Sequence, residues 1–182
     1  MGLDIRVATD IDNSSDIVSK SFDYRLSRTF CTIIARYYGV SSNSEIGQIS
    51  KLAKVDITRL MEMDKYPYGD GFDYSVIENE DERQRTIANA FAIMEKLKGN
   101  IDEVLFTIKA LIEAVSKIEN LPSLLGSSEY EVSVYLDYFG DFDKDKGDGY
   151  IGNNFGQDLR NFKQFLELAK IQGATTVWFD YG

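Results

Sequence analysis

The sequence predicts an α+β domain in which a small sheet packs against a helical middle. Three observations predict this fold class. Short segments that alternate apolar and polar residues stand near both ends of the chain, as half-buried strands do. Between them, apolar residues recur at steps of three and four, as on one face of a helix. The 182 residues fit a single domain, 1–182, and only two prolines interrupt it.

Three segments are expected to be strands. Leu3 to Val7 alternates, Glu129 to Phe139 alternates and is rich in Val and Tyr, and residues 174–181 repeat the pattern. A helix with apolar residues from 159 to 168 separates the last two, and Gly173 ends it. The N-terminal strand and the C-terminal strand–helix–strand unit should therefore share one three-stranded sheet covered by helices.

The helical middle is predicted to start near Ser21, with a first helix that ends at Gly39. Two short helices should follow. Asn43 or Ser44 is placed to cap the first, and Asp56 to cap the second, because their side-chain oxygens accept from backbone N–H groups that have no helical partner.

Two long helices are predicted after the turn-rich segment 66–72. The first runs from about Asn79 to Lys98, and Asn100 is expected to cap the second. Gly99 between them leaves room for a very short turn only. The pair should therefore fold back as an antiparallel αα-hairpin and supply the main helical packing.

Histidine is absent, and the chain has one cysteine, Cys31. These counts exclude Ser-His-Asp and Cys-His nucleophilic machinery, His- or thiolate-held zinc, imidazole acid–base chemistry and intrachain disulfides. Cys31 lies in the apolar run 30–34, so we interpret it as a buried packing residue. A bound metal would have to be a hard cation with oxygen ligands, such as Ca²⁺ or Mg²⁺.

The formal charge is −10, from 30 acidic and 20 basic side chains. Binding to nucleic acid or to an anionic membrane surface depends on cationic neutralisation, so neither is expected, whereas a basic protein partner is. No apolar run approaches the length needed to span a bilayer, and acids interrupt the N-terminal segment where a secretion signal would stand. We therefore expect a cytoplasmic location.

A Gly- and Asp-rich loop from 140 to 156 spaces its carboxylates like a calcium loop. The candidate metal ligands are Asp141, Asp143, Asp145 and Asp148. The match to an EF-hand is incomplete. With Gly149 as the turn glycine, Lys144 and Lys146 take the first and third ligand positions, and no carboxylate stands where the last, bidentate ligand belongs. The alternative is a solvated acidic loop.

Residues 147–152 also read G-x-G-x-x-G, the pattern of a dinucleotide-binding turn. The pattern neither follows its strand directly nor opens the helix, and four aspartates would face the pyrophosphate. We interpret it as a glycine-rich loop. Carboxylates on the expected strands, such as Asp4, Asp137 and Asp180, could converge for acid–base chemistry, but sequence does not give their separations.

Two segments combine negative charge with large rings. Glu62 to Glu82 holds eight acids and one lysine, and Gly126 to Gly156 holds seven acids and two lysines. Rings provide area to bury, and charge attracts a partner of opposite sign. The candidate partner-binding residues are Tyr66, Tyr68, Asp70, Phe72, Asp73, Tyr74, Phe142 and Tyr150. The alternative is that the rings fold inward as small satellite cores.

These features favour a non-enzymatic acidic binding protein that occupies a basic surface of a protein partner. In size, acidity and lack of catalytic side chains, the chain is similar to small bacterial or phage inhibitors, including immunity proteins and anti-defence factors. The resemblance implies inhibition of another protein, for instance at the nucleic-acid site of an enzyme. The alternative is a domain that holds Ca²⁺ or Mg²⁺ on the carboxylate loop and has ligand-binding or hydrolytic activity.

Overall fold

The computed structural model describes residues 5–11, 23–40, 44–67, 74–126, 137–147 and 149–181. In chain order the elements are β1 (Ile5–Thr9), α2 (Arg28–Val40), α3 (Glu45–Ala53), α4 (Thr58–Glu62), η2 (Met63–Lys65), η3 (Tyr74–Val76), α5 (Glu80–Leu97), α6 (Ile101–Val115), α7 (Leu121–Leu124), α9 (Phe155–Ile171) and β2 (Val177–Tyr181). This is the α+β class that the sequence predicts. Over the described ranges, no helix is long and apolar enough to cross a membrane.

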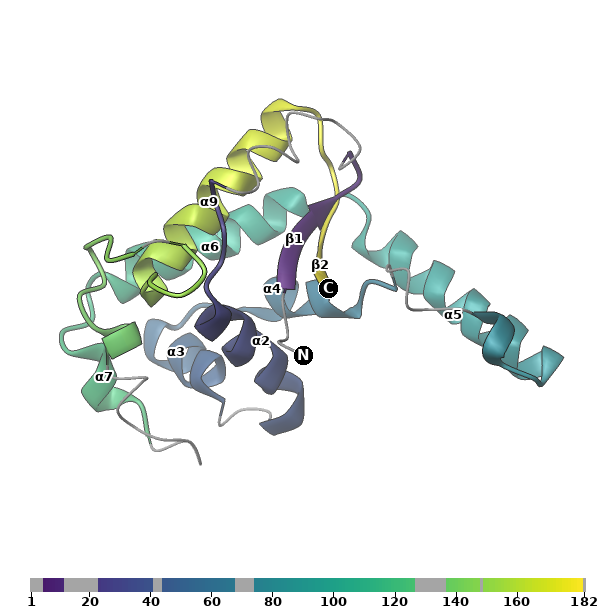
Figure 1. The fold of residues 1–182 in the computed structure, drawn as a ribbon, viewed down its shortest axis with the longest axis horizontal. Coiled ribbons are helices and arrows are strands. Elements are labelled where there is room, and N and C mark those ends of the chain that lie inside the picture. Colours follow the sequence, from purple (N-terminus) through teal and green to yellow (C-terminus); the bar gives the residue numbers. More distant parts are fainter. Residues whose placement is uncertain are drawn as a thin grey trace.

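The sheet joins the two ends of the chain (Figure 1). β1 and β2 pair antiparallel, with Val7 opposite Phe179 and Thr9 opposite Val177. The Arg6 side chain donates to the Asp180 carboxylate at 2.6 Å across the pair. The predicted pairing of the N-terminal strand with the C-terminal strand is therefore confirmed.

The third predicted strand, at 129–139, does not form in the part of it that the structure describes. Residues 129–136 lie outside the described part of the chain, and residues 137–139 have helical backbone. The strand prediction is wrong for these three residues. Aromatic packing fixes their position, and they form no hydrogen-bonded pair with a neighbouring strand among the described residues. Tyr138 and Phe139 contact the Phe155 ring at 5.9 and 5.2 Å between centroids.

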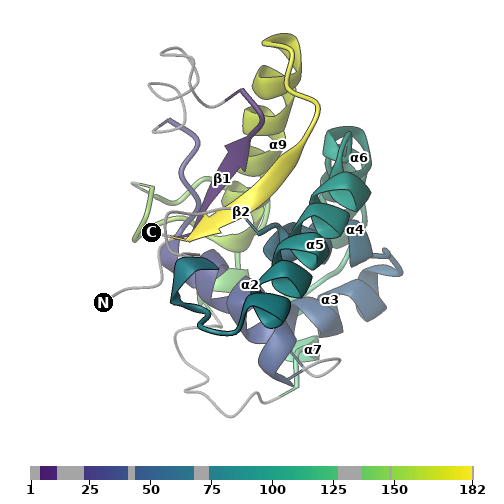
Figure 2. The same ribbon diagram turned by 90° about the vertical axis from the view of Figure 1, so that its right-hand side faces the viewer.

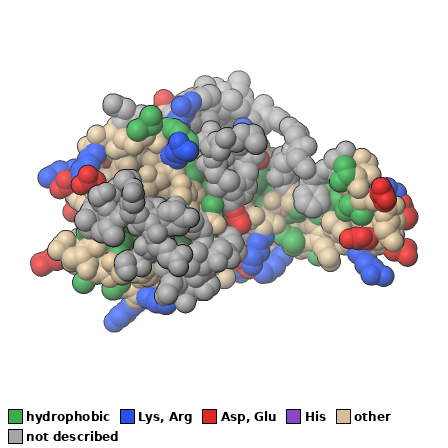
Figure 3. Space-filling view, turned by 60° about the horizontal axis from the view of Figure 1, so that its bottom comes forward, with side chains coloured by type: hydrophobic (Ala, Val, Ile, Leu, Met, Phe, Trp, Pro, Cys, Tyr) green, Lys and Arg blue, Asp and Glu red, His purple; other side chains and the backbone are tan. Residues whose placement is uncertain are grey.

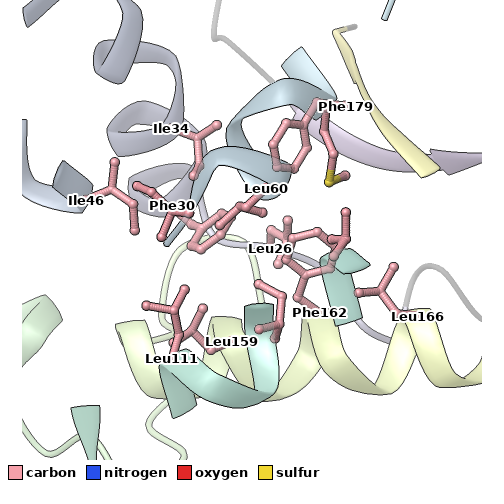
Figure 4. Packing of buried hydrophobic residues seen from close by; sticks show 14 of the residues in the cluster. Leu26, Phe30, Ile34, Ile46, Leu60, Leu111, Leu159, Phe162, Leu166 and Phe179 are labelled. Carbon is pink, nitrogen blue, oxygen red and sulfur yellow. The ribbon is translucent and has the colours of Figure 1, made fainter. Parts of the chain in front are cut away.

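The core lies where α2, α4, α6 and α9 meet. Figure 4 shows Phe30, Leu60, Leu111 and Phe162 converging from these four helices. The Phe30 ring meets that of Phe162 at 6.2 Å, and Phe162 in turn meets Phe179 of β2 at 6.0 Å. α9 therefore connects the helical body to the sheet.

Cys31 lies in this core, fully buried, and its thiol donates to the Ile5 carbonyl at 3.5 Å. The predicted packing role is confirmed. A side chain enclosed by apolar neighbours has no access to solvent, so it is not placed to act as a nucleophile.

The starts of α3 and α5 follow the local signals. The Ser44 hydroxyl accepts from Gly47 N at 3.3 Å and caps α3, and the Asn79 side chain accepts from Glu82 N at 3.0 Å and caps α5. α2 begins at Arg28 and not near Ser21. Its cap is Ser27, whose hydroxyl accepts from Phe30 N at 3.1 Å.

The two long helices have nearly the predicted bounds, but they do not fold back on each other. Figure 1 shows α6 lying along α9 inside the body, while α5 extends away to the other side. In Figure 2, which views the molecule from that side, α5 points toward the reader. The predicted antiparallel hairpin is therefore wrong in its packing. We call η3 and α5 together the arm.

The turn between the two helices explains their divergence. Asn100 does not cap α6; its side chain donates to Val177 O and accepts from Val177 N, both at 2.8 Å. Gly99 takes a left-handed φ of 76°, and Ile101, the first residue of α6, donates its N–H to Thr175 O at 3.2 Å. The start of α6 is thereby bound to the start of β2, which directs its apolar face to α9 and not to α5.

Candidate partner-binding surface

The first acidic segment is only partly described, since Tyr68, Asp70, Phe72 and Asp73 lie outside the described residues. Tyr66 is half-buried and stacks on Trp178 of β2, with ring centroids 4.4 Å apart and planes at 13°. Tyr74 is half-buried at the start of η3. The Tyr66 ring therefore covers the sheet, as in the satellite-core alternative.

The acids of this segment divide into two groups. Glu62 is buried and bound between Arg59 at 2.9 Å and Lys96 at 2.5 Å, so it ties α4 to the base of α5. The hydrogen bond from Lys96, more than the one from Arg59, lowers the pKa of Glu62 against the opposing effect of burial. Glu62 is thus a structural residue and not part of an exposed surface.

The second group lies at the far end of the arm. Glu78, Asp81 and Glu82 are exposed, and among the described residues their carboxylates form no ion pair. Val76 beside them has 74% of its surface exposed. Figure 3 shows acidic, hydrophobic and some basic side chains together on the outer part of the arm, at the right of the view. We call Val76, Glu78, Asp81 and Glu82 the acidic tip.

The local structure of the arm explains the position of the acidic tip. η3 packs against α5, and the Asn79 cap starts the helix directly after Glu78. Acids in the first turn also interact favourably with the positive end of the helix dipole. That interaction stabilises α5 by a few tenths of a kcal/mol per acid and leaves the carboxylates directed to solvent.

The rings of the second acidic segment are turned inward. Phe142 packs on Phe155, with ring centroids 6.2 Å apart, and the Arg160 guanidinium lies over the Phe142 ring, 6.0 Å from its centre. Tyr150 is half-buried, and its carbonyl accepts from Arg28 N at 2.8 Å. Among the described residues of this segment, Ile151 is a large apolar side chain that is exposed, at 89%. Phe142 therefore packs on the core beneath the loop, and Tyr150 binds the start of α2 through its main-chain carbonyl.

The carboxylates of this loop are largely neutralised by neighbouring cations. Asp141 pairs with Lys146 at 3.0 Å and Lys144 at 3.2 Å, and these hydrogen bonds lower its pKa. Asp145 binds Arg160 at 2.6 Å. Asp143 is exposed, and Asp148 lies outside the described residues. In the described part of the chain, no three acidic, Cys or His side chains gather closely enough to hold a metal ion.

Backbone N–H groups in and beside the G-x-G-x-x-G loop donate hydrogen bonds to side chains of the same region. The Gln157 side chain accepts from Lys146 N and Gly147 N, both at 3.0 Å, and Asn153 accepts from Gly149 N at 3.1 Å. A phosphate would need these N–H groups. Glycine is required at 147 because a Cβ there would lie 2.1 Å from the carbonyl carbon of Gly152. These N–H groups are therefore already bonded within the protein and are not free to bind a phosphate, in agreement with the interpretation of the segment as a glycine-rich loop.

Sequence reasoning missed Asp158, which is the most deeply buried ionisable acid among the described residues. Its carboxylate accepts from Ser27 N at 2.8 Å, Ser27 Oγ at 2.5 Å, Tyr138 Oη at 2.7 Å and Asn153 Nδ2 at 2.9 Å. A signal was available. Asp158 comes three residues after Phe155 and four before Phe162, which places it on the apolar face of α9.

The Asp158 network is chemically saturated. A carboxylate offers about four lone-pair positions, and four donors occupy them. Burial raises the pKa of Asp158 in spite of these hydrogen bonds, and burial also raises the pKa of Tyr138 well above its usual range. The network joins the start of α2, residues 137–139 and α9, which is a structural role.

Of the strand carboxylates, Asp180 is bound to Arg6, Asp137 is exposed on the helical stretch 137–139, and Asp4 lies outside the described residues.

No protein-family model, no curated protein and no solved structure matches this chain. The case for a function therefore depends on the residues themselves.

Proposed function

We propose that this protein is a non-enzymatic acidic binding protein that uses the acidic tip to occupy a basic surface of a protein partner. The observation that carries the proposal is a set of exposed carboxylates, unpaired among the described residues, on an arm that extends from the body. Val76, two residues before Glu78, is an exposed apolar side chain on the same arm that a partner could bury.

The contrast between the two acidic segments supports the tip over the 140–154 loop. Asp141 and Asp145 are already bound to Lys and Arg, so a basic partner would have to compete with those cations. The tip carboxylates have no such competitor in the described residues. Free charge of one sign raises the rate of encounter with an opposite charge, and salt screens the effect.

The partner expected from this chemistry is a protein with a Lys- and Arg-rich patch. Binding there would block access of other acidic molecules to the same patch, as an inhibitor of the immunity or anti-defence type does. Rim charges act mainly on the association rate, whereas the buried apolar contact at Val76 should act mainly on dissociation.

The test is a charge reversal at the tip. Asp81→Lys with Glu82→Lys should abolish salt-sensitive capture of a cellular protein by the immobilised chain, because both substitutions turn attraction into repulsion. Glu113→Lys with Glu119→Lys is the matched control, since it changes the net charge equally at exposed positions of the body. Melting curves of both variants report whether the fold is intact.

For a partner so identified, the tip variant should lower the association rate constant by roughly tenfold or more at low salt, with little effect at high salt. The proposal fails if both double variants bind the captured protein equally well. It fails also if capture does not depend on salt.

A further inference from the structure

One side of α5 has a charge and size pattern that is complementary to itself. Its positions lie three or four residues apart and so form one stripe along the helix. The stripe consists of Glu80, Arg83, Ile87, Phe91 and Glu95 of α5 and of Lys98, the residue that directly follows the helix. Phe91 has 62% of its surface exposed, and Ile87 is half-buried. An exposed phenyl ring beside an isoleucine is a site where burial would release free energy.

The position of α5 leaves this stripe accessible. The helix has 18 residues, about 27 Å at the usual rise of 1.5 Å per residue. It extends away from the body (Figure 1), and its buried side chains, Ala90 and Leu97, are not members of the stripe, although Ala90 borders it three residues after Ile87. The body holds α5 at its base, where Lys96 binds Glu62.

The charges at the two ends of the stripe have the same order. Glu80 pairs with Arg83 near the N-terminal end, and Glu95 pairs with Lys98 at 3.7 Å near the C-terminal end. All four side chains are partly exposed, with Glu95 and Lys98 at 74% and 69%. Each end therefore presents an acid followed, three residues later, by a base.

An antiparallel copy of α5 matches this order at every position. With a two-fold axis at the level of Asn89, Glu80 stands opposite Lys98 and Arg83 opposite Glu95. In the same register, Ile87 stands opposite Phe91, so each ring packs on the isoleucine of the other copy. Every charged side chain then has a neighbour of opposite sign both within its helix and across the pair.

A parallel copy of α5 in the same register would bring like charges together across the pair. Glu80 would face Glu80 and Lys98 would face Lys98, which costs free energy. The charge pattern thus favours the antiparallel orientation over the parallel one.

We propose that two copies of this chain associate through α5, with the helices antiparallel and Phe91 of each packed on Ile87 of the other. The interface is isologous, which is the commonest symmetry of soluble dimers. Burial of the two rings and two isoleucines supplies the attraction. The exposed ion pairs contribute little free energy and set the register.

This inference goes beyond the proposed function and does not depend on it. Asp81 and Glu82 lie outside the stripe, on other sides of α5, so the tip stays exposed in the dimer. The tip variant should therefore still dimerise, and a failure of one proposal leaves the other standing.

The test is sedimentation velocity of the full chain over a range of concentrations. The wild type should show a concentration-dependent monomer–dimer equilibrium. Phe91→Ala should raise the dimer dissociation constant roughly tenfold or more, as truncation of a central interface ring does. Phe106→Ala is the control, because that ring, on α6, is 74% exposed and lies outside the stripe. Equal effects of the two truncations, or a monomeric wild type throughout, would overturn the proposal.

A charge exchange tests the orientation. Glu80→Lys alone and Lys98→Glu alone should each weaken self-association, because each sets like charges across the pair. An equimolar mixture of the two variants should recover the dimer, since position 80 of one then faces an opposite charge at position 98 of the other. A mixture that stays as weak as its components overturns the antiparallel register. Melting curves confirm that each variant is folded.

Discussion

Single buried polar side chains hold together segments that are far apart in this chain. Asp158 collects four donors from three segments, and Asn100 makes two main-chain hydrogen bonds to Val177. A buried polar group that has its partners stabilises a unique arrangement. At the residue scale, these few polar contacts add to the apolar core in deciding which segments lie together.

The raised pKa of Asp158 makes stability depend on pH in a defined direction. The folded state holds this proton more tightly than the unfolded chain, whose carboxyl has the usual value of 3.8. The resulting stabilisation is complete below the unfolded pKa and is lost as the pH rises through the folded pKa. The wild type should therefore lose stability relative to Asp158→Asn as the pH rises from about 4 toward neutrality.

Urea unfolding of the two proteins across this pH range measures the effect. Asp143→Asn controls for the change in net charge, because Asp143 is exposed in the neighbouring loop. A constant difference between the wild type and Asp158→Asn at every pH, or a trend of the opposite sign, would show that burial does not raise this pKa.

Among the elements, α5 and α6 show how two helices with similar sequence patterns come to have different roles. α6 buries its apolar face, namely Val104, Leu105, Ile108, Leu111 and Val115, against the body. α5 leaves Phe91 exposed and carries the acidic tip. One helix builds the core and the other presents surface.

Truncation of the α6 face should therefore be costly. Ile108→Ala should lower the free energy of unfolding by about 2–5 kcal/mol, because it removes fully buried methyl groups and leaves a cavity. Leu105→Ala, at a site 7% exposed, should fall in the lower part of that range. Phe106→Ala on the exposed side should change stability by no more than about 0.5 kcal/mol. Denaturant unfolding measures all three, and equal effects on both faces of α6 would contradict this packing.

The whole molecule is closed by the pairing of its two end segments. β1 buries Ile5 and Ala8, and Ile5 O accepts from the Cys31 thiol in the core. Asp10, just after β1, accepts from Thr175 N at 3.0 Å and from Thr175 Oγ1 at 2.6 Å, just before β2. A two-stranded sheet of five residues each is too small to be stable alone, so it depends on the helices beneath it and they depend on it.

Removal of residues 1–9 should consequently abolish the cooperative thermal transition of the entire domain, as observed by circular dichroism or calorimetry. Arg6→Ala, which removes only an exposed ion pair with Asp180, should cost less than about 1 kcal/mol and keep the transition. A truncated chain that still melts like the wild type would show that the sheet is dispensable.

The sequence by itself determined the features that depend on neighbours within a few residues. The bounds of α5, the cap at Ser44 and the stop at Gly99 all follow from periodicity and from single residues beside the backbone that they cap or end. The counts of acids, bases and histidines likewise bounded the chemistry, because a side chain that the chain lacks can take no part in a reaction.

Only the tertiary structure decided which surfaces those elements share. α9 and β2 occupy the positions around the start of α6, so α5 is directed outward although its sequence fits a hairpin equally well. In the same way, Phe142 and Tyr66 turn inward because Phe155 and Trp178 happen to lie beneath them, and Asp141 is neutralised by Lys146. Local preference acts over one or two turns of chain, whereas packing is a competition among all apolar surfaces of the molecule for the same few partners.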